Sequence, residues 1–338
     1  METAAFDYDL PPSAIAQVPV EPRDAARLLI DQGPGRPPRH GHVRDLPSLV
    51  GAGDVVVVNT TKVLPARLLL RKATGGAVEV LLLEPLDPDE RTWEALVRPS
   101  RKLRPGTSLP AGEDLTVVVG DDLGEGRRRV EVLLAPSVDL LDALERHGAV
   151  PLPPYITTPL ADPDRYQTTY AVQPGSVAAP TAGLHLTPAV LAGIRQAGAT
   201  VAEVDLAVGL GTFRPIATAA VEAHQMHAER YRVPAATMDA CRHADRVVAV
   251  GTTTVRALES AAVSGELSGR TDLFIHGERR FAVVDALLTN FHQPRSSLLV
   301  LVDAFIGPRW RMLYEEALSA GYRFLSFGDA MLVDGVRG

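Results

Sequence analysis

The sequence predicts an α/β protein whose main domain is formed by both ends of the chain and is interrupted by a β-rich insertion. Two observations support this fold class. In residues 151–338, apolar strand-like runs alternate with helical patterns, as in a sheet covered by helices. In residues 67–150, short β-type runs follow one another at a spacing of about 8–12 residues, which is typical of small barrels and sandwiches. We therefore expect an α/β domain of residues 1–66 and 151–338 around an all-β, barrel-like insertion of residues 67–150.

The amino-terminal segment contains two expected strands. Prolines between residues 11 and 22 exclude a long helix there, and the run from Arg27 to Ile30 follows as a short strand. The four valines Val55 to Val58 stand between Gly53-Asp54 and the polar run Asn59-Thr60-Thr61. This pattern predicts a strand that is buried on both faces and delivers polar residues at its carboxyl end.

In the insertion, turn residues separate the β-type runs. Gly75-Gly76 and the segment 121–126, which contains two aspartates and two glycines, suit tight hairpins. A short helix in residues 138–147 closes the insertion, with Gly148 as its stop.

In the second half, strands and helices alternate. Residues 187–198 have helical spacing, with Pro188 in the first turn and Gly198 after the end. The strands expected near residues 199–206 and 246–250 both run into glycine turns, and the second passes into a helix. The apolar run 297–307 is a strand or a buried helix. This alternation predicts a sheet with helices on its faces.

Composition and charge exclude several classes of protein. The 338 residues are 46% hydrophobic and 22% charged, which argues against disorder. A net charge of −7 argues against a protein that coats nucleic acid through its overall field, so a polynucleotide partner requires a local patch. The single Cys241 excludes a disulfide framework and a multi-cysteine zinc site. With no apolar stretch near the roughly 20 residues that cross a bilayer, and acids at the start, we expect a cytoplasmic monomer without a membrane partner.

Small and hydroxyl-bearing residues follow the expected strands of the second half. Ligands of open α/β folds sit beyond the carboxyl ends of strands, where glycines let the backbone approach them closely. The sequence matches neither the dinucleotide fingerprint G-x-G-x-x-G nor the P-loop, which disfavours a nucleotide oxidoreductase and an NTPase. The alternative is that these glycines serve only the turns. The candidates to line one cleft are Gly209, Gly211, Thr212, Gly251, Thr252 and Thr253.

Four histidines lie next to these turns, namely His185, His224, His227 and His292. The spacing of three between His224 and His227 would put both on one face of a helix, as in a metal hydrolase with Glu229 nearby. The H-E-x-x-H spacing and an evident third ligand are both missing, which weakens that hypothesis. Proton transfer by one of these histidines is at least as well supported, and a structural role is the default for any single one.

Basic residues form three local clusters. Two of them fall in the insertion, where loops can present them to phosphates. The alternative is that they are ordinary solvated arginines. The clusters are Arg98, Arg101, Lys102 and Arg104; Arg127, Arg128 and Arg129; and, outside the insertion, Arg309 and Arg311.

Ten segments together resemble one known family over nearly the whole chain. These segments are FDYDLP, EPRDAARLL, VNTTKVLPARL, VRPSRKLRPG, PTAGLHLTP, VGLGTFRPI, HQMHAE, GTTTVRALES, LLTNFHQPRSSLL and YRFLSFGDAML. In their order they resemble the S-adenosylmethionine:tRNA ribosyltransferase-isomerases of queuosine biosynthesis. The resemblance implies an α/β domain with a β-barrel insertion. It also implies transfer and isomerisation of the ribosyl group of S-adenosylmethionine onto the aminomethyl group of a 7-deazaguanine at the tRNA wobble position, giving epoxyqueuosine, adenine and methionine without a metal.

The implied chemistry suggests roles for residues in these segments. A sulfonium acidifies the adjacent 5′-carbon, so a base must remove a proton there, and adenine leaves more easily when a ring nitrogen is protonated. We expect His185 and His292 to carry this acid–base work, with Asp329 and Asp7 as lesser candidates. Arg256 is expected to bind a carboxylate bidentately. The residues expected to bind substrate or cosubstrate are Arg23, Asn59, Lys62, Arg67, Thr181, Gly183, Gly209, Gly211, Thr212, His224, His227, Thr252, Thr253, Arg256 and Asn290.

Three positions depart from the family pattern. Thr60 stands where the family usually has aspartate, Ala207 where it has histidine, and Phe327 where it has tyrosine. Three lost polar groups near the expected cleft suggest two alternatives: the same chemistry on a small-molecule acceptor, or a homologue that binds tRNA or the sulfonium compound without turnover.

Overall fold

The chain divides into two compact units. The computed structural model describes residues 1–209 and 215–335. The first unit groups residues 1–62, 153–173 and 179–338, and the second groups residues 63–152 and 174–178. The strands β4 (Thr61–Val63) and β12 (Gln173–Ser176), which pair with each other, contain points where the chain passes from one unit to the other.

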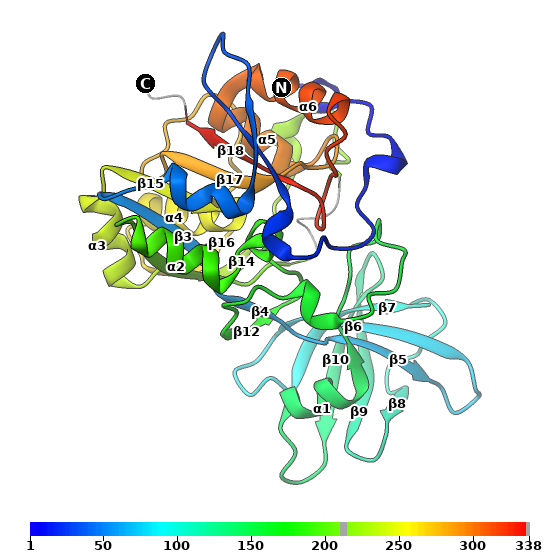
Figure 1. Ribbon diagram of the computed structural model, residues 1–338. Coiled ribbons are helices and arrows are strands. Elements are labelled where there is room, and N and C mark those ends of the chain that lie inside the picture. Colours follow the sequence, from blue (N-terminus) through cyan, green and yellow to red (C-terminus); the bar gives the residue numbers. More distant parts are fainter. Residues whose placement is uncertain (210–214, 336–338) are drawn as a thin grey trace. The chain divides into compact units, whose positions relative to one another are not determined.

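A nine-stranded sheet organises the first unit (Figure 1). Its order is β16-β14-β13-β3-β15-β17-β18-β1-β2. The four neighbours β13, β3, β15 and β17 are parallel, whereas β14, β16 and β2 run antiparallel to the strands beside them, as do β17 and β18 to each other. The strands are β1 (Arg27–Ile30), β2 (Arg39–His42), β3 (Asp54–Asn59), β13 (Thr200–Leu206), β14 (Glu229–Arg232), β15 (Arg246–Val250), β16 (Ser268–Thr271), β17 (Ala286–Asn290) and β18 (Ala330–Asp334).

Local capping explains where two helices of this unit begin. The Thr187 hydroxyl accepts from the backbone N–H of Val190 at the start of α2, and the Ser296 hydroxyl accepts from that of Leu299 at the start of α5. The apolar run that the sequence left open as strand or helix is therefore helix α5. The α-helices are α2 (Pro188–Gln196), α3 (Ala235–His243), α4 (Thr252–Ser264), α5 (Ser297–Ile306) and α6 (Trp310–Ser319). The 3-10 turns are η1 (Thr3–Phe6), η2 (Pro12–Ala14), η3 (Arg23–Ala25), η4 (Val43–Leu49), η5 (Pro163–Tyr166), η6 (Thr181–His185), η8 (Val221–Ala223) and η9 (Gly307–Arg309).

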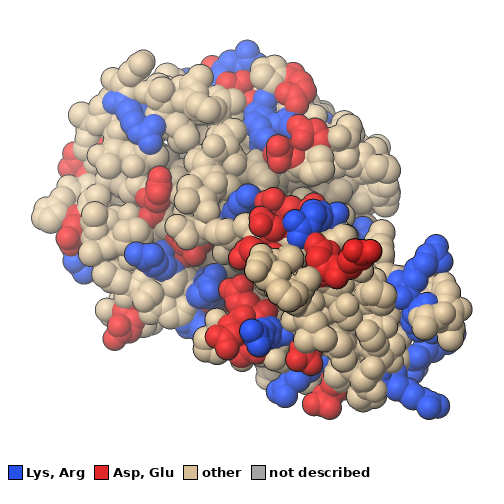
Figure 2. Space-filling model, turned by 90° about the horizontal axis from the view of Figure 1, so that it is seen from below, with Lys and Arg blue, Asp and Glu red and all other residues tan. Residues whose placement is uncertain are grey.

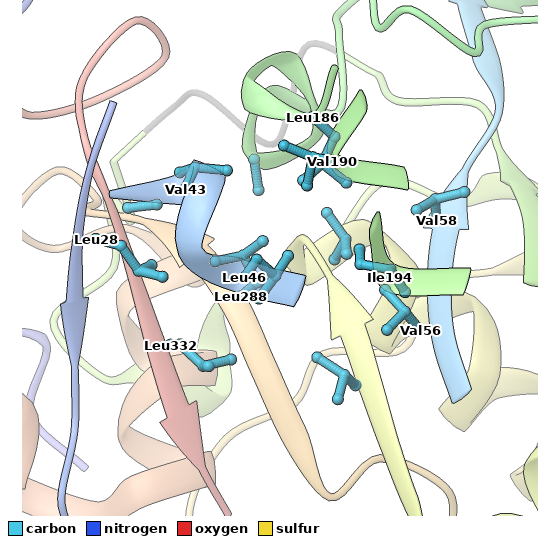
Figure 3. Packing of buried hydrophobic residues seen from close by; sticks show 14 of the residues in the cluster. Leu28, Val43, Leu46, Val56, Val58, Leu186, Val190, Ile194, Leu288 and Leu332 are labelled. Carbon is cyan, nitrogen blue, oxygen red and sulfur yellow. The ribbon is translucent and has the colours of Figure 1, made fainter. Parts of the chain in front are cut away.

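Alternating residues of the strands bury both faces of this sheet. On one face, Val56 and Val58 of β3 pack with Leu46 of η4 and with Val190 and Ile194 of α2 (Figure 3). The valines between them are also buried, and α4 packs against β13, β15 and β3. The predicted strand of four valines is thus confirmed, and burial on both faces explains its continuous apolar run.

The second unit is a single antiparallel sheet of seven strands, in the order β11-β5-β6-β7-β10-β9-β8. The sheet curls so that β5 and β8 come into contact, which gives it the form of a partial barrel. Inward residues alternate along β7, where Trp93, Ala95 and Val97 are buried. The elements are β5 (Arg67–Arg71), β6 (Ala77–Pro85), β7 (Thr92–Arg98), β8 (Ser108–Ala111), β9 (Leu115–Gly124), β10 (Arg127–Leu134), α1 (Leu140–His147) and β11 (Gly148–Ala149).

Of the two hairpin turns predicted for this unit, the first lies where it was expected, and the second lies at the end of the predicted segment 121–126. Gly75-Gly76 lies between β5 and β6, as expected. Asp121 and Asp122 belong to strand β9, and the chain reverses at Glu125-Gly126 instead. Within the described residues, no helix combines the length and the apolar character needed to cross a membrane.

Candidate functional site

The carboxyl ends of the four parallel strands surround a recess in the α/β unit. Because β13, β3, β15 and β17 are parallel neighbours, their carboxyl ends reach the same edge of the sheet, where open α/β folds bind ligands. Two adjoining hollows form the recess and share Thr181, Asn290, His292 and Leu298. The remaining lining residues are Tyr155, Phe291, Gln293, Ser296, Leu325 and Ser326 in one hollow, and Ala179, Pro180, Ala182, Val208, Gly251, Thr252, Thr253 and Thr289 in the other.

Asn59 ties three of the surrounding elements together. Its Nδ2 donates to the carbonyl of Leu206 at 3.0 Å and to the hydroxyl of Thr253 at 3.3 Å. Its Oδ1 accepts from the backbone N–H of Leu206 and of Thr61. All of these partners belong to the protein, and Asn59 is buried, so this predicted binding residue holds the ends of β3 and β13 against the start of α4.

Helix α4 begins at the recess. Gly251 precedes it with φ +88°, in the left-handed region that glycine adopts without strain. Thr252 and Thr253, in the first turn, line the recess as the sequence predicted. The first N–H groups of a helix have no intrahelical acceptor, and the helix dipole favours negative charge there. This side of the recess therefore offers hydroxyls and backbone donors to an anionic or polar group.

His292 lines both hollows and is held from several sides. Its backbone N–H donates to the Tyr314 hydroxyl at 2.9 Å, and its carbonyl accepts from the Tyr8 hydroxyl. Its Nε2 lies 2.9 Å from the Thr289 hydroxyl. Burial lowers the pKa of His292 to about 3, so the imidazole is neutral at pH 7. A neutral imidazole has one nitrogen able to accept a proton.

His185 lies behind the recess, on the far side of Asn290. The Asn290 Nδ2 is 3.2 Å from the Nε2 of His185 and 3.4 Å from the carbonyl of Asp329, and its Oδ1 accepts from the Thr181 hydroxyl at 2.8 Å. The carbonyl of Asp329 can only accept a hydrogen bond, so the Asn290 atom beside it is the donor Nδ2. The same Nδ2 donates to the Nε2 of His185, which is therefore unprotonated. The proton of the neutral imidazole is then on Nδ1. His185 is thus linked to the recess through Asn290.

A separate small hollow contains the His185 side chain. Arg23, Arg165 and Phe327 contribute to its lining. Burial, followed by the charges of Arg323, Arg165 and Arg23, lowers the pKa of His185 to about 3. Arg23 donates to the carbonyls of Gln167, Leu184 and Asp164, so this predicted binding residue braces the chain around the hollow.

Arg256, which the sequence suggested as a ligand for a carboxylate, pairs with an acid of the protein itself. Its guanidinium forms a buried ion pair with Glu229 and also donates to the carbonyls of Leu273 and Thr271. The other oxygen of Glu229 accepts from the backbone N–H of Gly209 at 2.7 Å. The pair is satisfied within the protein and fixes the segment after β13, where Val208 lines the recess.

Neither aspartate that the sequence suggested for proton transfer lines the recess. Asp329 is buried, and its two oxygens accept from the backbone N–H groups of Arg27 at 2.8 Å and Arg323 at 2.7 Å. Asp7 forms an exposed ion pair with Arg295. Asp329 therefore joins two chain segments through its carboxylate.

Several other predicted binding residues have structural surroundings. A Cβ on the buried Gly183 would collide with the Tyr170 hydroxyl, so close packing favours glycine there. Lys62 belongs to β4, and Arg67, in the β-rich unit, forms an ion pair with Glu79 at 3.0 Å. Gly211 and Thr212 lie outside the described residues.

The spacing of His224 and His227 does not produce a metal site in the described part of the chain. Both lie in the segment between η8 and β14, not on a helix. His224 packs against the ring of Phe274, and Glu229 is held by Arg256. Within residues 1–209 and 215–335, no three His, Cys, Asp or Glu side chains are placed to hold a metal ion.

The basic residues of the β-rich unit are only partly exposed. Arg98, Arg101, Lys102, Arg104 and Arg129 are exposed. Arg127 pairs with Glu94, whereas Arg128 is buried, donates to the carbonyl of Leu103 at 2.6 Å and pairs with Asp122. Arg128, which the sequence suggested as a tRNA contact, thus has its partners inside the unit. Figure 2 shows acidic and basic side chains interspersed near the centre of the face, whereas basic side chains gather along its right edge.

The three departures from the family pattern lie outside the recess lining. Thr60 is buried, and its hydroxyl is 3.2 Å from the carbonyl of Val204, which an ionised aspartate would repel. Ala207 pairs with Arg230 of β14 through its backbone N–H. Phe327 lines the hollow of His185 and packs edge-on against Tyr166.

Sequence reasoning missed the aromatic residues that support the recess. Tyr8 and Tyr314 hold the backbone of His292, and Tyr155 lines the recess with its hydroxyl 2.7 Å from that of Ser326. Tyr8 lies within one of the segments that carry the family resemblance. The other two depend on contacts between residues that are far apart in the chain.

A recess at a parallel sheet edge, lined by a helix start, hydroxyls and a neutral histidine, is characteristic of α/β proteins that bind a small polar ligand. The family model described as "Queuosine biosynthesis protein" matches residues 3–333. The chain belongs to this family.

Similar proteins cover nearly the whole chain. A protein of Rubrobacter xylanophilus named S-adenosylmethionine:tRNA ribosyltransferase-isomerase is 52% identical, over 99% of this chain and 98% of its own. A Thermotoga maritima protein of the same name is 48% identical, over 98% of this chain and 100% of its own. The crystal structure of S-adenosylmethionine tRNA ribosyltransferase from Thermotoga maritima matches with a TM-score of 0.55 and 39% identity, over 97% of this chain and 99% of that one.

Proposed function

We propose that the protein transfers and isomerises the ribosyl group of S-adenosylmethionine onto the aminomethyl group of 7-aminomethyl-7-deazaguanine in tRNA. The products are epoxyqueuosine in the tRNA, adenine and methionine. Full-length relatives that share about half of its residues carry the corresponding name, which supports this function. A small-molecule acceptor and a protein without turnover are not favoured, because those names specify tRNA and a transferase-isomerase.

The observation that carries the mechanism is the neutral His292 in a recess at the carboxyl ends of the strands. The positive sulfonium acidifies the 5′-carbon of the cosubstrate, and His292 accepts that proton through its free-base nitrogen. Thr289 and the two tyrosines around the His292 backbone hold the imidazole in place. A neutral base also avoids placing a second positive charge next to the sulfonium before the proton is transferred.

The methionine carboxylate takes a position other than the one expected from the sequence. Because Arg256 is bound to Glu229, we assign the carboxylate to the start of α4, where the dipole and the hydroxyls of Thr252 and Thr253 favour an anion. His185 acts as a positioning residue, since its contact with the recess passes through Asn290. The apolar walls at Val208 and Leu298 help to keep water from the reactive sugar.

We also propose how the rest of the chain serves this reaction. The α/β unit is the catalytic domain, and the β-rich unit is an inserted domain whose exposed Arg98, Arg101, Lys102, Arg104 and Arg129 attract tRNA phosphates. The enzyme acts in the cytoplasm as a monomer. It requires no metal ion, because the sulfonium already activates the carbon from which the proton is removed. Activity that survives chelators supports this part of the proposal.

The decisive experiment replaces His292 by alanine and by glutamine. With saturating cosubstrate and precursor-bearing tRNA, loss of the base lowers kcat by about 10²–10⁴-fold. Release of adenine and transfer of label into the tRNA are measured together. His243→Ala is the matched control, because His243 is exposed at the end of α3 and its Nδ1 donates locally to the Asp239 carbonyl.

The outcomes separate the alternatives. Near-normal turnover of both His292 variants would show that another group is the base. Label that enters a free 7-deazapurine but not tRNA would support the small-molecule acceptor. Tight binding of cosubstrate and tRNA by the unmodified protein, without adenine release, would identify a protein without turnover.

A further inference from the structure

The two hollows of the recess differ in what they offer a ligand. The α4 hollow, which contains Thr252 and Thr253, presents a helix start and hydroxyls. The α5 hollow is the one lined by Gln293, Ser296 and Leu298 around the start of α5. Among the described residues that line the α5 hollow, none is Lys, Arg, Asp or Glu. An uncharged group therefore suits the α5 hollow, whereas an anion suits the α4 hollow.

Two leucines form apolar walls of the α5 hollow. Leu298 is partly exposed, and Leu325 is buried with φ +68°, in the left-handed region that residues with a side chain seldom adopt. The backbone N–H of Leu325 donates to the carbonyl of Phe291 at 3.1 Å, and its carbonyl accepts from the N–H of Gly328 at 2.9 Å. Strained positions that the surrounding chain holds in this way cluster at ligand sites. The two apolar walls suit the faces of a flat ring.

Gln293 adds a primary amide to this hollow. In the part of the chain that the structure describes, the Gln293 side chain hydrogen-bonds to no protein group, and it is partly exposed. The other amide of the recess, Asn290, is already bound to Thr181 and His185. A primary amide offers a donor and an acceptor side by side. The adenine edge formed by N7 and the N6 amino group presents the complementary pair, which glutamine can bind with both atoms.

The order of the hollows matches the order of groups in S-adenosylmethionine. The hollows adjoin at His292, which lines both. The cosubstrate has its carboxylate at one end, its ribose in the middle and its adenine at the other end. With the carboxylate at the start of α4, the ribose lies beside His292 and the adenine reaches the α5 hollow.

We propose that the α5 hollow is the adenine subsite and that Gln293 recognises the base. Its Nε2 donates to adenine N7, its Oε1 accepts from the N6 amino group, and Leu298 and Leu325 cover the faces of the ring. This inference rests on the proposed function for the identity of the cosubstrate. Hypoxanthine has a carbonyl at C6, so two acceptors would face the amide and one of them would lack a donor.

The test pairs a change in the protein with a change in the ligand. Equilibrium dialysis measures binding of S-adenosylmethionine and of its 7-deaza analogue, in which C–H replaces N7. Saturating tRNA with guanine at the wobble position is present, so that no acceptor is available. The unmodified protein is expected to bind the 7-deaza analogue about fivefold more weakly, the effect of one hydrogen bond. Gln293→Leu is expected to bind S-adenosylmethionine about 10–100-fold more weakly and to distinguish the two ligands by less than twofold.

Two controls accompany this cycle. Gln196→Leu makes the same substitution at an exposed position at the end of α2, and is expected to bind both ligands within twofold of the unmodified protein. The analogue that carries hypoxanthine is expected to bind the unmodified protein about tenfold more weakly than S-adenosylmethionine does. Melting temperatures confirm that the variants are folded. The comparisons of ligands on the unmodified protein decide the proposal even if Gln293→Leu does not fold.

Three results would overturn the proposal. One is equal binding of S-adenosylmethionine and the 7-deaza analogue by the unmodified protein. Another is the same loss for the 7-deaza analogue in the unmodified protein and in Gln293→Leu, because the variant has no amide to lose contact with N7. The third is binding of S-adenosylmethionine by Gln293→Leu within twofold of the unmodified protein.

Failure of the proposed function is recognised separately. If the unmodified protein transfers ribosyl to precursor-bearing tRNA and the loss of N7 is independent of Gln293, the subsite is wrong and the function stands. If the two changes are coupled but neither adenine nor labelled tRNA forms from precursor-bearing tRNA, the function fails and the subsite stands. An unmodified protein that does not bind S-adenosylmethionine overturns both.

Discussion

The buried ion pair between Glu229 and Arg256 allows a quantitative prediction. The two side chains are 5% and 3% exposed, and Arg256 also donates to two backbone carbonyls. Glu229→Gln removes the negative charge and leaves the guanidinium buried without a counter-ion. Breaking a buried pair from one side costs about 3–5 kcal/mol. At roughly 2–4 °C per kcal/mol, the α/β unit is expected to melt about 6–20 °C lower.

The two tryptophans make this measurement specific. Trp310 is buried in α6 of the α/β unit, whereas Trp93 is buried in β7 of the β-rich unit. In a Trp93→Phe background, fluorescence melting therefore reports on the α/β unit alone. The control is Asp239→Asn, which breaks the exposed pair with Arg242 and is expected to change stability by less than about 1 kcal/mol.

A second variant tests whether the unpaired buried charge of Arg256 causes this loss of stability. Glu229→Gln/Arg256→Met removes both charges, and is expected to regain much of the lost stability because no charge remains buried. In Glu229→Gln, a neutral amide replaces the carboxylate that accepts from the backbone N–H of Gly209, so this hydrogen bond weakens. The neighbouring recess wall at Val208 becomes less rigid, and the KM for the cosubstrate is expected to rise. A shift in the Trp310 transition of less than 2 °C for Glu229→Gln alone would refute this reasoning.

Three further predictions follow from the site. Because His292 has a pKa of about 3 when folded and 6.5 when unfolded, only the unfolded state binds its proton between these values, and stability falls as pH drops below 6.5. His292→Gln removes this effect, so urea titrations should show that the unmodified protein loses about 2 kcal/mol more than the variant between pH 7 and 5. Asp329→Asn leaves a buried N–H without its acceptor and is expected to cost about 1–3 kcal/mol, while kcat, measured by adenine release from folded enzyme, stays within twofold; a large loss of kcat would restore its catalytic role. Gly183→Ala is expected to destabilise by about 1–3 kcal/mol because its Cβ meets the Tyr170 hydroxyl, and calorimetry should show partial recovery with Tyr170→Phe.

Local sequence patterns predicted the strands and helices that surround the recess. The valines of β3 and the strand-turn-helix of β15 and α4 have apolar spacing that depends only on neighbouring residues. The same patterns placed Thr252, Thr253 and His292 at strand ends, where the structure has them in the recess. These features were predictable because they follow from periodicity and from the rule for ligands of α/β sheets.

Side-chain partners from distant parts of the chain were not predictable in this way. Arg256 has the chemistry to bind a carboxylate, and it does so, but the carboxylate belongs to Glu229. Asp329 looked available for proton transfer, yet it accepts from two backbone N–H groups, one of them about 300 residues away. Such partners depend on strand register and loop path, which one sequence alone does not specify.

The position of β18 in the strand order determines when the nine-stranded sheet can be completed during synthesis. The strand spans Ala330–Asp334, yet it lies between β17 and β1, so the early hairpin of β1 and β2 has no neighbour in the sheet until these residues have been synthesised. At roughly 5–20 residues per second, the ribosome needs about 15–60 s between those two points. A chain that stops short of β18 leaves apolar strand edges of β17 and β1 unpaired. Products truncated before β18 are therefore expected to be prone to aggregation or proteolysis.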